Sequence, residues 1–96
     1  MKEIELKSDP QYFKEVFKGN KRFEVRFNDR DYQVGDFLIL KEYDPKLNEY
    51  SGREIKCKVL YLLSDPNFVK AGFVILSIRI VKIIDKNLGD NDQQRQ

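Results

Sequence analysis

The sequence predicts an α+β protein in which one amphipathic helix packs against a five-stranded β-sheet that curls into a barrel. Only one stretch shows apolar residues at helical spacing, whereas five others alternate in polarity or stay apolar over the length of a strand. The 96 residues, 41% of them hydrophobic, fit one domain with its own core. One helix cannot cover both faces of five strands, so the economical arrangement is a barrel that the helix plugs at one end.

The helix is predicted at residues 9–18, after a first short strand. Ser8 or Asp9 can cap its free amides, and Pro10 lies in the first turn, where a missing N–H costs nothing. Gly19 ends the helix in the left-handed region of backbone space. The buried face is an apolar stripe of Tyr12, Phe13, Val16 and Phe17.

Period-two alternation and long apolar runs predict the strands. They are residues 3–7, 22–27, 36–43, 52–62 and 73–84. Gly35 supplies the positive φ of a tight turn before the third strand, which is apolar on both faces, as in a closed barrel. In the fourth strand one face carries Ile55, Cys57, Val59 and Tyr61. Cys57 is therefore predicted to face the core.

The remaining segments are loops and a tail. Residues 44–51 and 64–70 contain prolines and short polar side chains, which are typical of loops. Residues 1–84 are predicted to form the single domain. Residues 85–96 are polar and are predicted to be a disordered tail.

Composition excludes several classes of function. The chain has no histidine and one cysteine, so Ser-His-Asp and Cys-His catalysis, histidine metal sites and thiolate zinc sites are excluded. No metal or cofactor is expected. A single cysteine, with no signal region and no apolar run of membrane-spanning length, predicts a reducing, cytoplasmic location without membrane association.

A charged motif lies where the helix gives way to the second strand. The net charge is only +2, but residues 18–30 form the most basic stretch. Within it, residues 19–26 have the pattern G-x-K-x-x-E-x-R. Glu24 and Arg26 are two apart on a strand and share one face, and Lys21 can lean over the same region. The three side chains make either a net positive site that can grip phosphate or an ion-pair network that closes the barrel end.

This motif resembles the signature of the ASCH (activating-signal-cointegrator homology) family, within the PUA-like superfamily. Residues 28–36, 50–55 and 72–76 are similar to its small single-domain branch of unknown function, and the resemblance spans roughly residues 4–80. It implies a PUA-like barrel that binds RNA or a nucleotide in a basic cleft. Lys21, Glu24 and Arg26 are the implied ligand contacts.

Four further residues are candidate ligand contacts. Lys7 and Arg30 could touch phosphates, and Tyr43 could stack on a base. Arg53 is the fourth. For Tyr43 the alternative is a half-buried strand aromatic, and for Arg53 it is an exposed residue at the start of a strand.

Two other functions remain open. The resemblance also implies a small hydrolase, acting on an acylated nucleoside or on RNA, with Lys21 and Glu24 as its catalytic pair. In amidohydrolases of this family a threonine occupies the position of Glu24, and the branch often has a histidine where this chain has Ile4. A carboxylate does not replace a hydroxyl nucleophile, so catalysis is not the leading expectation. The third possibility is a protein-interaction module in which the motif is structural.

Overall fold

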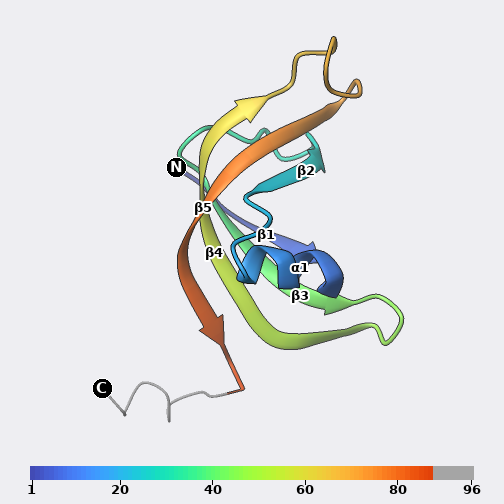
Figure 1. The fold of residues 1–96 in the computed structure, drawn as a ribbon, viewed down its shortest axis with the longest axis vertical. Helices are drawn as coiled ribbons and strands as arrows, with labels where there is room; N and C mark the ends of the chain where they lie inside the picture. Colours follow the sequence, from blue (N-terminus) through green and yellow to red (C-terminus); the bar gives the residue numbers. More distant parts are fainter. Residues whose placement is uncertain (88–96) are drawn as a thin grey trace.

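The computed structural model describes residues 1–87, which form one curled β-sheet with a short helix inside its curve (Figure 1). Its elements are β1 (Glu3–Ser8), α1 (Pro10–Phe17), β2 (Phe23–Phe27), β3 (Phe37–Asp44), β4 (Glu49–Leu63) and β5 (Phe73–Asp85). The order β-α-β-β-β-β and the approximate position of every element agree with the sequence prediction. The fold is mostly β, as a small α+β barrel-like domain should be.

The sheet curls into a half-barrel and does not close. Its strands are hydrogen-bonded in the order β1-β3-β4-β5-β2. β1 runs parallel to β3, and the other neighbours are antiparallel. β1 and β2 are therefore the two edges of the sheet. The expectation of a closed barrel is corrected, because no backbone ladder joins these two edges within residues 1–87.

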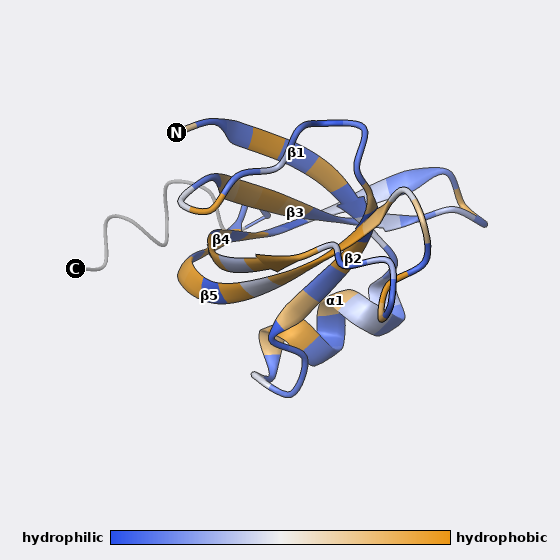
Figure 2. Cartoon of the chain, turned by 90° about the horizontal axis from the view of Figure 1, so that it is seen from above, coloured by the Kyte–Doolittle hydropathy of each residue, from blue (hydrophilic) through white to orange (hydrophobic). Residues whose placement is uncertain are grey.

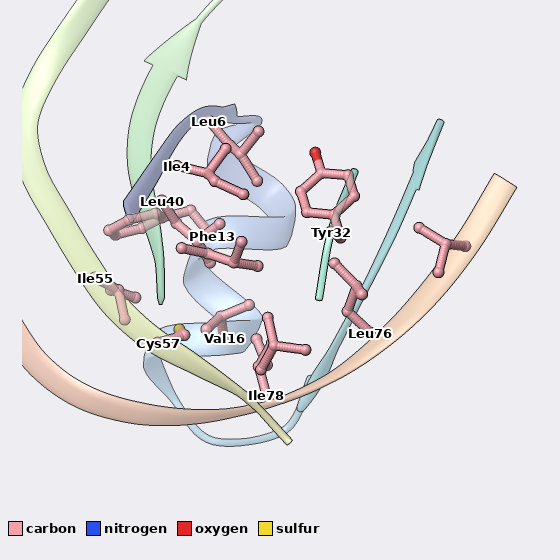
Figure 3. Packing of buried hydrophobic residues seen from close by; sticks show 13 residues of the cluster. Ile4, Leu6, Phe13, Val16, Tyr32, Leu40, Ile55, Cys57, Leu76 and Ile78 are labelled. Atoms are coloured by element: carbon pink, nitrogen blue, oxygen red, sulfur yellow. The ribbon is translucent and has the colours of Figure 1, made fainter. Parts of the chain in front are cut away.

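Helix α1 lies on the concave side of the sheet and supplies part of the core (Figure 3). The Asp9 side chain accepts a hydrogen bond from the Gln11 amide, which caps the start of the helix as predicted. Phe13 and Val16 are fully buried against the strands. The other two residues of the predicted stripe, Tyr12 and Phe17, are exposed, because an eight-residue helix buries only a narrow face in this curve.

The inner face of the sheet is aliphatic and follows the alternation of the strands, as the colouring of β1 in Figure 2 shows. It includes Ile4, Leu6, Leu38, Leu40, Ile55, Val59, Val74, Leu76 and Ile78. Cys57 is fully buried among them, as predicted. Tyr61 was expected on the same face but is exposed, because the register shifts between Val59 and Tyr61 and turns the strand over.

The C-terminal boundary differs from the prediction. β5 continues to Asp85, the Lys86 amide donates to the Gly52 carbonyl, and the Asn87 side chain donates to the Ser51 carbonyl. The first three residues of the expected tail are therefore held against the start of β4. The rest of that expected tail, residues 88–96, lies outside the described residues. The described chain contains no helix with the length and apolar character needed to cross a bilayer.

Candidate functional site at the open seam

Strand β2 turns its charged side chains inward and its apolar side chains outward. Glu24 is buried, with 3% of its surface exposed, and Arg26 is half-buried, whereas Phe23, Val25 and Phe27 are all exposed. The predicted alternation is confirmed, but an edge strand of this kind reverses the usual arrangement of an apolar inner face. A charged cluster thus lies at the boundary of the core.

Glu24 is the centre of this cluster. Its Oε2 accepts a 2.7 Å hydrogen bond from Lys21 Nζ, and its Oε1 lies 3.1 Å from Arg26 Nε and 2.9 Å from Arg26 Nη2. The Lys21 and Arg26 side chains are 17% and 24% exposed, so both cations still reach the surface. A buried carboxylate needs such partners, and two of them leave one net positive charge facing solvent.

The end of α1 positions Lys21. Gly19 adopts a φ of +83°, and its amide donates to the Val16 carbonyl, so the chain leaves the helix in a left-handed turn. The Lys21 amide then donates to the Glu15 carbonyl, and its Nζ donates to the Phe23 carbonyl at 2.7 Å. The glycine of the motif is therefore a helix terminator, and its lysine is folded back over the strand that follows.

Arginine side chains bridge the seam, by which we mean the gap between edge strands β1 and β2. Arg26 Nη2 donates to the Lys7 carbonyl at 3.0 Å, and Arg30 Nη2 lies 3.5 Å from the Glu5 carbonyl. Both carbonyls belong to β1, which has no strand partner on this side within residues 1–87. Guanidinium groups thus occupy positions where a barrel would have main-chain amides.

Two clefts lie along the seam and share Lys7 and Arg26. The helix-side cleft has a volume of about 530 Å³ and is lined by Lys7, Ser8, Asp9, Tyr12, Lys21, Phe23, Glu24, Val25 and Arg26. The loop-side cleft has a volume of about 440 Å³ and is lined by Glu5, Leu6, Lys7, Arg26, Phe27, Asp29, Arg30, Tyr32, Lys41 and Tyr50. Both volumes are within the range of small-molecule sites.

The loop-side cleft contains a buried tyrosine. Tyr32 is only 2% exposed, and its hydroxyl oxygen is turned away from the aliphatic cluster (Figure 3). Its amide is held by the Asn28 side chain. Burial raises the pKa of the Tyr32 hydroxyl, and the positive charge of Arg26 opposes this rise. The hydroxyl therefore stays protonated at neutral pH and is a hydrogen-bond donor at the cleft.

Tyr43 lies beside the seam but not in the lining of either cleft. Lys7 Nζ is 4.3 Å from the centre of its ring, and Tyr50 packs edge-on against it at 4.9 Å. Its hydroxyl bonds the Asn48 side chain. Tyr43 thus supports Lys7 by a cation–π contact, and its neighbour Tyr50 lines the loop-side cleft.

Arg53 lies away from both clefts. Its Nε and Nη2 donate to the two carboxylate oxygens of Glu42 at 3.0 and 3.2 Å, and its guanidinium lies over Phe13 and Phe17 of α1. The hydrogen bonds that Arg53 donates to Glu42 raise the pKa of Arg53, and burial acts in the opposite direction. Arg53 therefore anchors the helix to β3, and the structure does not bring it together with the other candidate residues.

The structure also adds residues that sequence reasoning missed. Tyr12 and Phe23 line the helix-side cleft, and Tyr32 and Tyr50 line the loop-side cleft. One signal was available in the sequence, because Phe23 lies within the motif and Tyr12 lies in the helix just before it. No such signal was available for Tyr32 and Tyr50, since only the curl of the sheet brings them to the seam.

Cys57 offers no catalytic thiolate. Burial raises the pKa of its thiol to about 12; the charge of Glu24 adds to this rise, and that of Lys21 opposes it. Across residues 1–87, no three acidic or thiol side chains gather as a candidate metal site. The chemistry that the seam offers is thus cationic hydrogen bonding beside aromatic surface.

Two comparisons with known proteins are informative. An uncharacterized 12.9 kDa protein encoded in the GpA 3′ region of Escherichia phage P2 is 38% identical over 55 residues, which is 57% of this chain and 49% of the relative. The match thus spans about half the length of that relative. A family described as a domain of unknown function, DUF3850, matches residues 4–78. These residues include the motif, β2 and every residue that lines the two clefts, and the chain accordingly belongs to the DUF3850 family.

Proposed function

We propose that this protein is a PUA-like (ASCH) module that binds single-stranded RNA or a nucleotide at the seam between β1 and β2. One observation carries the proposal: Glu24 holds Lys21 and Arg26 in a net positive cluster, in which Lys21 lines the helix-side cleft and Arg26 lines both clefts. Each cleft also has aromatic residues in its lining. Proteins generally hold a single-stranded nucleic acid with cations along its phosphate backbone and with aromatic rings on which its bases stack.

The balance of charge along the seam supports an anionic ligand. Glu24 is neutralised by its own partners, whereas Lys7 and Arg30 have no carboxylate within 4.0 Å in the described part of the chain. Arg26 Nη1 has no acceptor in residues 1–87, although Nε and Nη2 of the same side chain are engaged. Donors that remain free at the mouth of a cleft favour a phosphate. We place the protein in the reducing cytoplasm, where the free thiol of Cys57 is stable.

Titration with a short single-stranded RNA at two salt concentrations tests the proposal. Binding should weaken as salt rises, with a slope of roughly 0.7 per phosphate contact. Lys21→Ala and Arg26→Ala should each weaken it while the fold is retained. Lys14→Ala is the matched control, because Lys14 is exposed on α1 and lines neither cleft. Unchanged affinity in both seam variants would refute the proposal.

A hydrolase acting on an acylated nucleoside or on RNA is a second candidate, and the contact between Lys21 and Glu24 favours it. The 2.7 Å distance allows a proton to pass between them, as an acid–base pair requires. Lys21 is also one of the two partners that satisfy the buried Glu24 carboxylate, so we rank this function below binding. Product detected by mass spectrometry, and lost in Lys21→Ala, would establish turnover.

The protein-interaction alternative is supported by the outer row of β2. Phe23, Val25 and Phe27 are exposed along one edge strand, and such edges are surfaces on which partners assemble. If RNA does not bind, and if Phe27→Ser abolishes association with a partner while Arg26→Ala does not, this function replaces the first.

A further inference from the structure

The two clefts of the seam share one pair of cations. Lys7 and Arg26 line both clefts, and every other lining residue belongs to only one. Lys7 is exposed, and the Arg26 guanidinium is fixed by Glu24 and by the Lys7 carbonyl. The order along the seam is thus a cleft, a pair of cations and a second cleft.

Each cleft has its own aromatic wall. Phe23 and Tyr12 belong to the helix-side cleft, and both are exposed. Phe27 and Tyr50 belong to the loop-side cleft and are also exposed. Phe23 and Phe27 are four residues apart on an extended strand, roughly 13 Å, so a single base does not reach both rings.

The shared cations, Arg26 and Lys7, have free donors that can serve one phosphodiester group. The Nη1 of Arg26 carries two N–H groups without an acceptor in residues 1–87, and Lys7 Nζ contacts only the face of Tyr43 there. A phosphodiester offers two unbridged oxygens, which match a guanidinium fork and a point charge.

The loop-side cleft has polar groups that the helix-side cleft lacks. Tyr32 lines this cleft with only 2% of the residue exposed, and its hydroxyl, which has no hydrogen-bond partner among the described residues, still reaches the surface. Arg30 and Lys41 are further cations of this cleft, and Arg30 has no carboxylate within 4.0 Å in the same part of the chain. A nucleotide in this cleft meets donors for its base edge, its 2′-hydroxyl or a further phosphate.

We propose, building on the function proposed above, that the seam binds two consecutive nucleotides of a single strand. The phosphodiester that links them lies on Arg26 and Lys7, and one base packs in each cleft. The minimal ligand is therefore a dinucleotide and not a mononucleotide.

The test is a titration of the whole chain with adenosine ligands of increasing length. Binding is monitored by the chemical shifts of the backbone amides. The probes are adenosine 5′-monophosphate, ApA and ApApA, with d(ApA) to show whether the 2′-hydroxyl is read. We expect ApA to bind at least about tenfold more tightly than the mononucleotide, since a second stacked base and the phosphodiester are gained together. The step from ApA to ApApA should be no more than about threefold.

Variants in each cleft separate the two base positions. Phe23→Leu and Phe27→Leu keep an apolar side chain and remove one ring each, and both should weaken ApA by about three- to tenfold. Val81→Ala is the control, since Val81 is exposed on β5 and lines neither cleft. Thermal unfolding of all three variants checks that the fold is kept.

The outcomes distinguish the two-nucleotide site from the proposed binding function on which it rests. If the mononucleotide binds as tightly as ApA and still depends on Lys21 and Arg26, the two-nucleotide site is wrong and the binding module stands. If affinity rises equally with every added nucleotide, the seam binds a single strand without a fixed number of nucleotide positions, and the inference is also wrong. If none of these ligands nor a longer RNA binds, both proposals fail.

Discussion

Nη2 of Arg26 donates a 3.0 Å hydrogen bond to the main-chain carbonyl of Lys7, and this bond joins the two strands at opposite ends of the sheet order. The same guanidinium bonds Glu24. One side chain therefore links the buried acid of the motif to the edge of β1, and the consequence is testable.

Replacing Arg26 by lysine should weaken this link. A lysine keeps the positive charge, but its single ammonium group cannot reproduce a fork that contacts both Glu24 and the β1 carbonyl. We expect Arg26→Lys to lower the free energy of unfolding by about 0.5–1.5 kcal/mol in urea titrations. The matched control is Arg30→Lys, because Arg30 is exposed and its contact with β1 is long, at 3.5 Å. Equal losses in the two variants would mean that the Arg26 bridge is not structural.

Removing the Glu24 carboxylate should destabilise the fold. Glu24→Ala leaves two cations facing each other at the core boundary, and we expect a loss of about 1–3 kcal/mol, because both cations can still reach water. Glu3→Ala is the control, since the Glu3 side chain is 59% exposed where it pairs with Lys56, and such pairs contribute about 0–1 kcal/mol. If Glu24→Ala unfolds at the same urea concentration as the parent, the pair has no net stabilising effect.

The glycine of the motif is required for its backbone angle and not for lack of space. A Cβ built on Gly19 has no neighbour within 4 Å, but φ is +83°. We expect Gly19→Ala to lower stability by about 1–2 kcal/mol, as an L-residue in a left-handed turn does. Gly19→Asn should lose less, because asparagine tolerates this region. Both values come from thermal unfolding, and a larger loss for asparagine would point to a steric cause.

Cys57 should be unreactive in the folded protein. Burial raises the pKa of this thiol to about 12, from an ordinary value of 9.0. At pH 8 the thiolate fraction should therefore be lower by about 10³-fold, and iodoacetamide should react far more slowly with the native chain than with the chain in urea. Mass spectrometry of timed samples gives both rates. Rapid native labelling would show that the core around β4 opens readily.

Stability should fall in acid through two buried carboxylates. Burial alone would raise the pKa of Asp36, but hydrogen bonds from Lys2 and Gln33 outweigh it and lower that pKa below 3.8. For Glu42, burial is likewise outweighed by Arg53 and Ser51, and its pKa lies below 4.5.

Because both pKa values are lowered in the folded state, the stability they provide is complete above about pH 5 and is lost as the pH falls through 4 and below. Urea midpoints measured between pH 6 and pH 3 should show this decline. Asp36→Asn should flatten it, whereas Glu3→Gln, at an exposed position, should not. An unchanged slope in Asp36→Asn would exclude Asp36 as a source of the acid sensitivity.

The sequence by itself determined the elements and most of their inner faces. Local signals were sufficient for α1, where Asp9, Pro10 and Gly19 mark both ends, and for β5, where alternation places Val74 and Leu76 in the core. It also grouped Lys21, Glu24 and Arg26, because residues this close along a chain share a site through local geometry alone.

Only the tertiary structure decided which way β2 faces, that the barrel stays open and which distant residues meet at the seam. Alternation shows that two faces differ but not which one is buried, and Glu24 is buried because Lys21 and Arg26 satisfy it. Tyr32 and Tyr50 reach the loop-side cleft only because the sheet curls. The sequence prediction that groups Arg53 with the other candidate residues also failed for a tertiary reason, since its partner Glu42 comes from a neighbouring strand. Contacts between residues far apart in sequence depend on the curvature and register of the whole sheet. Bulges set both the curvature and the register, and no local sequence pattern predicts where these bulges occur.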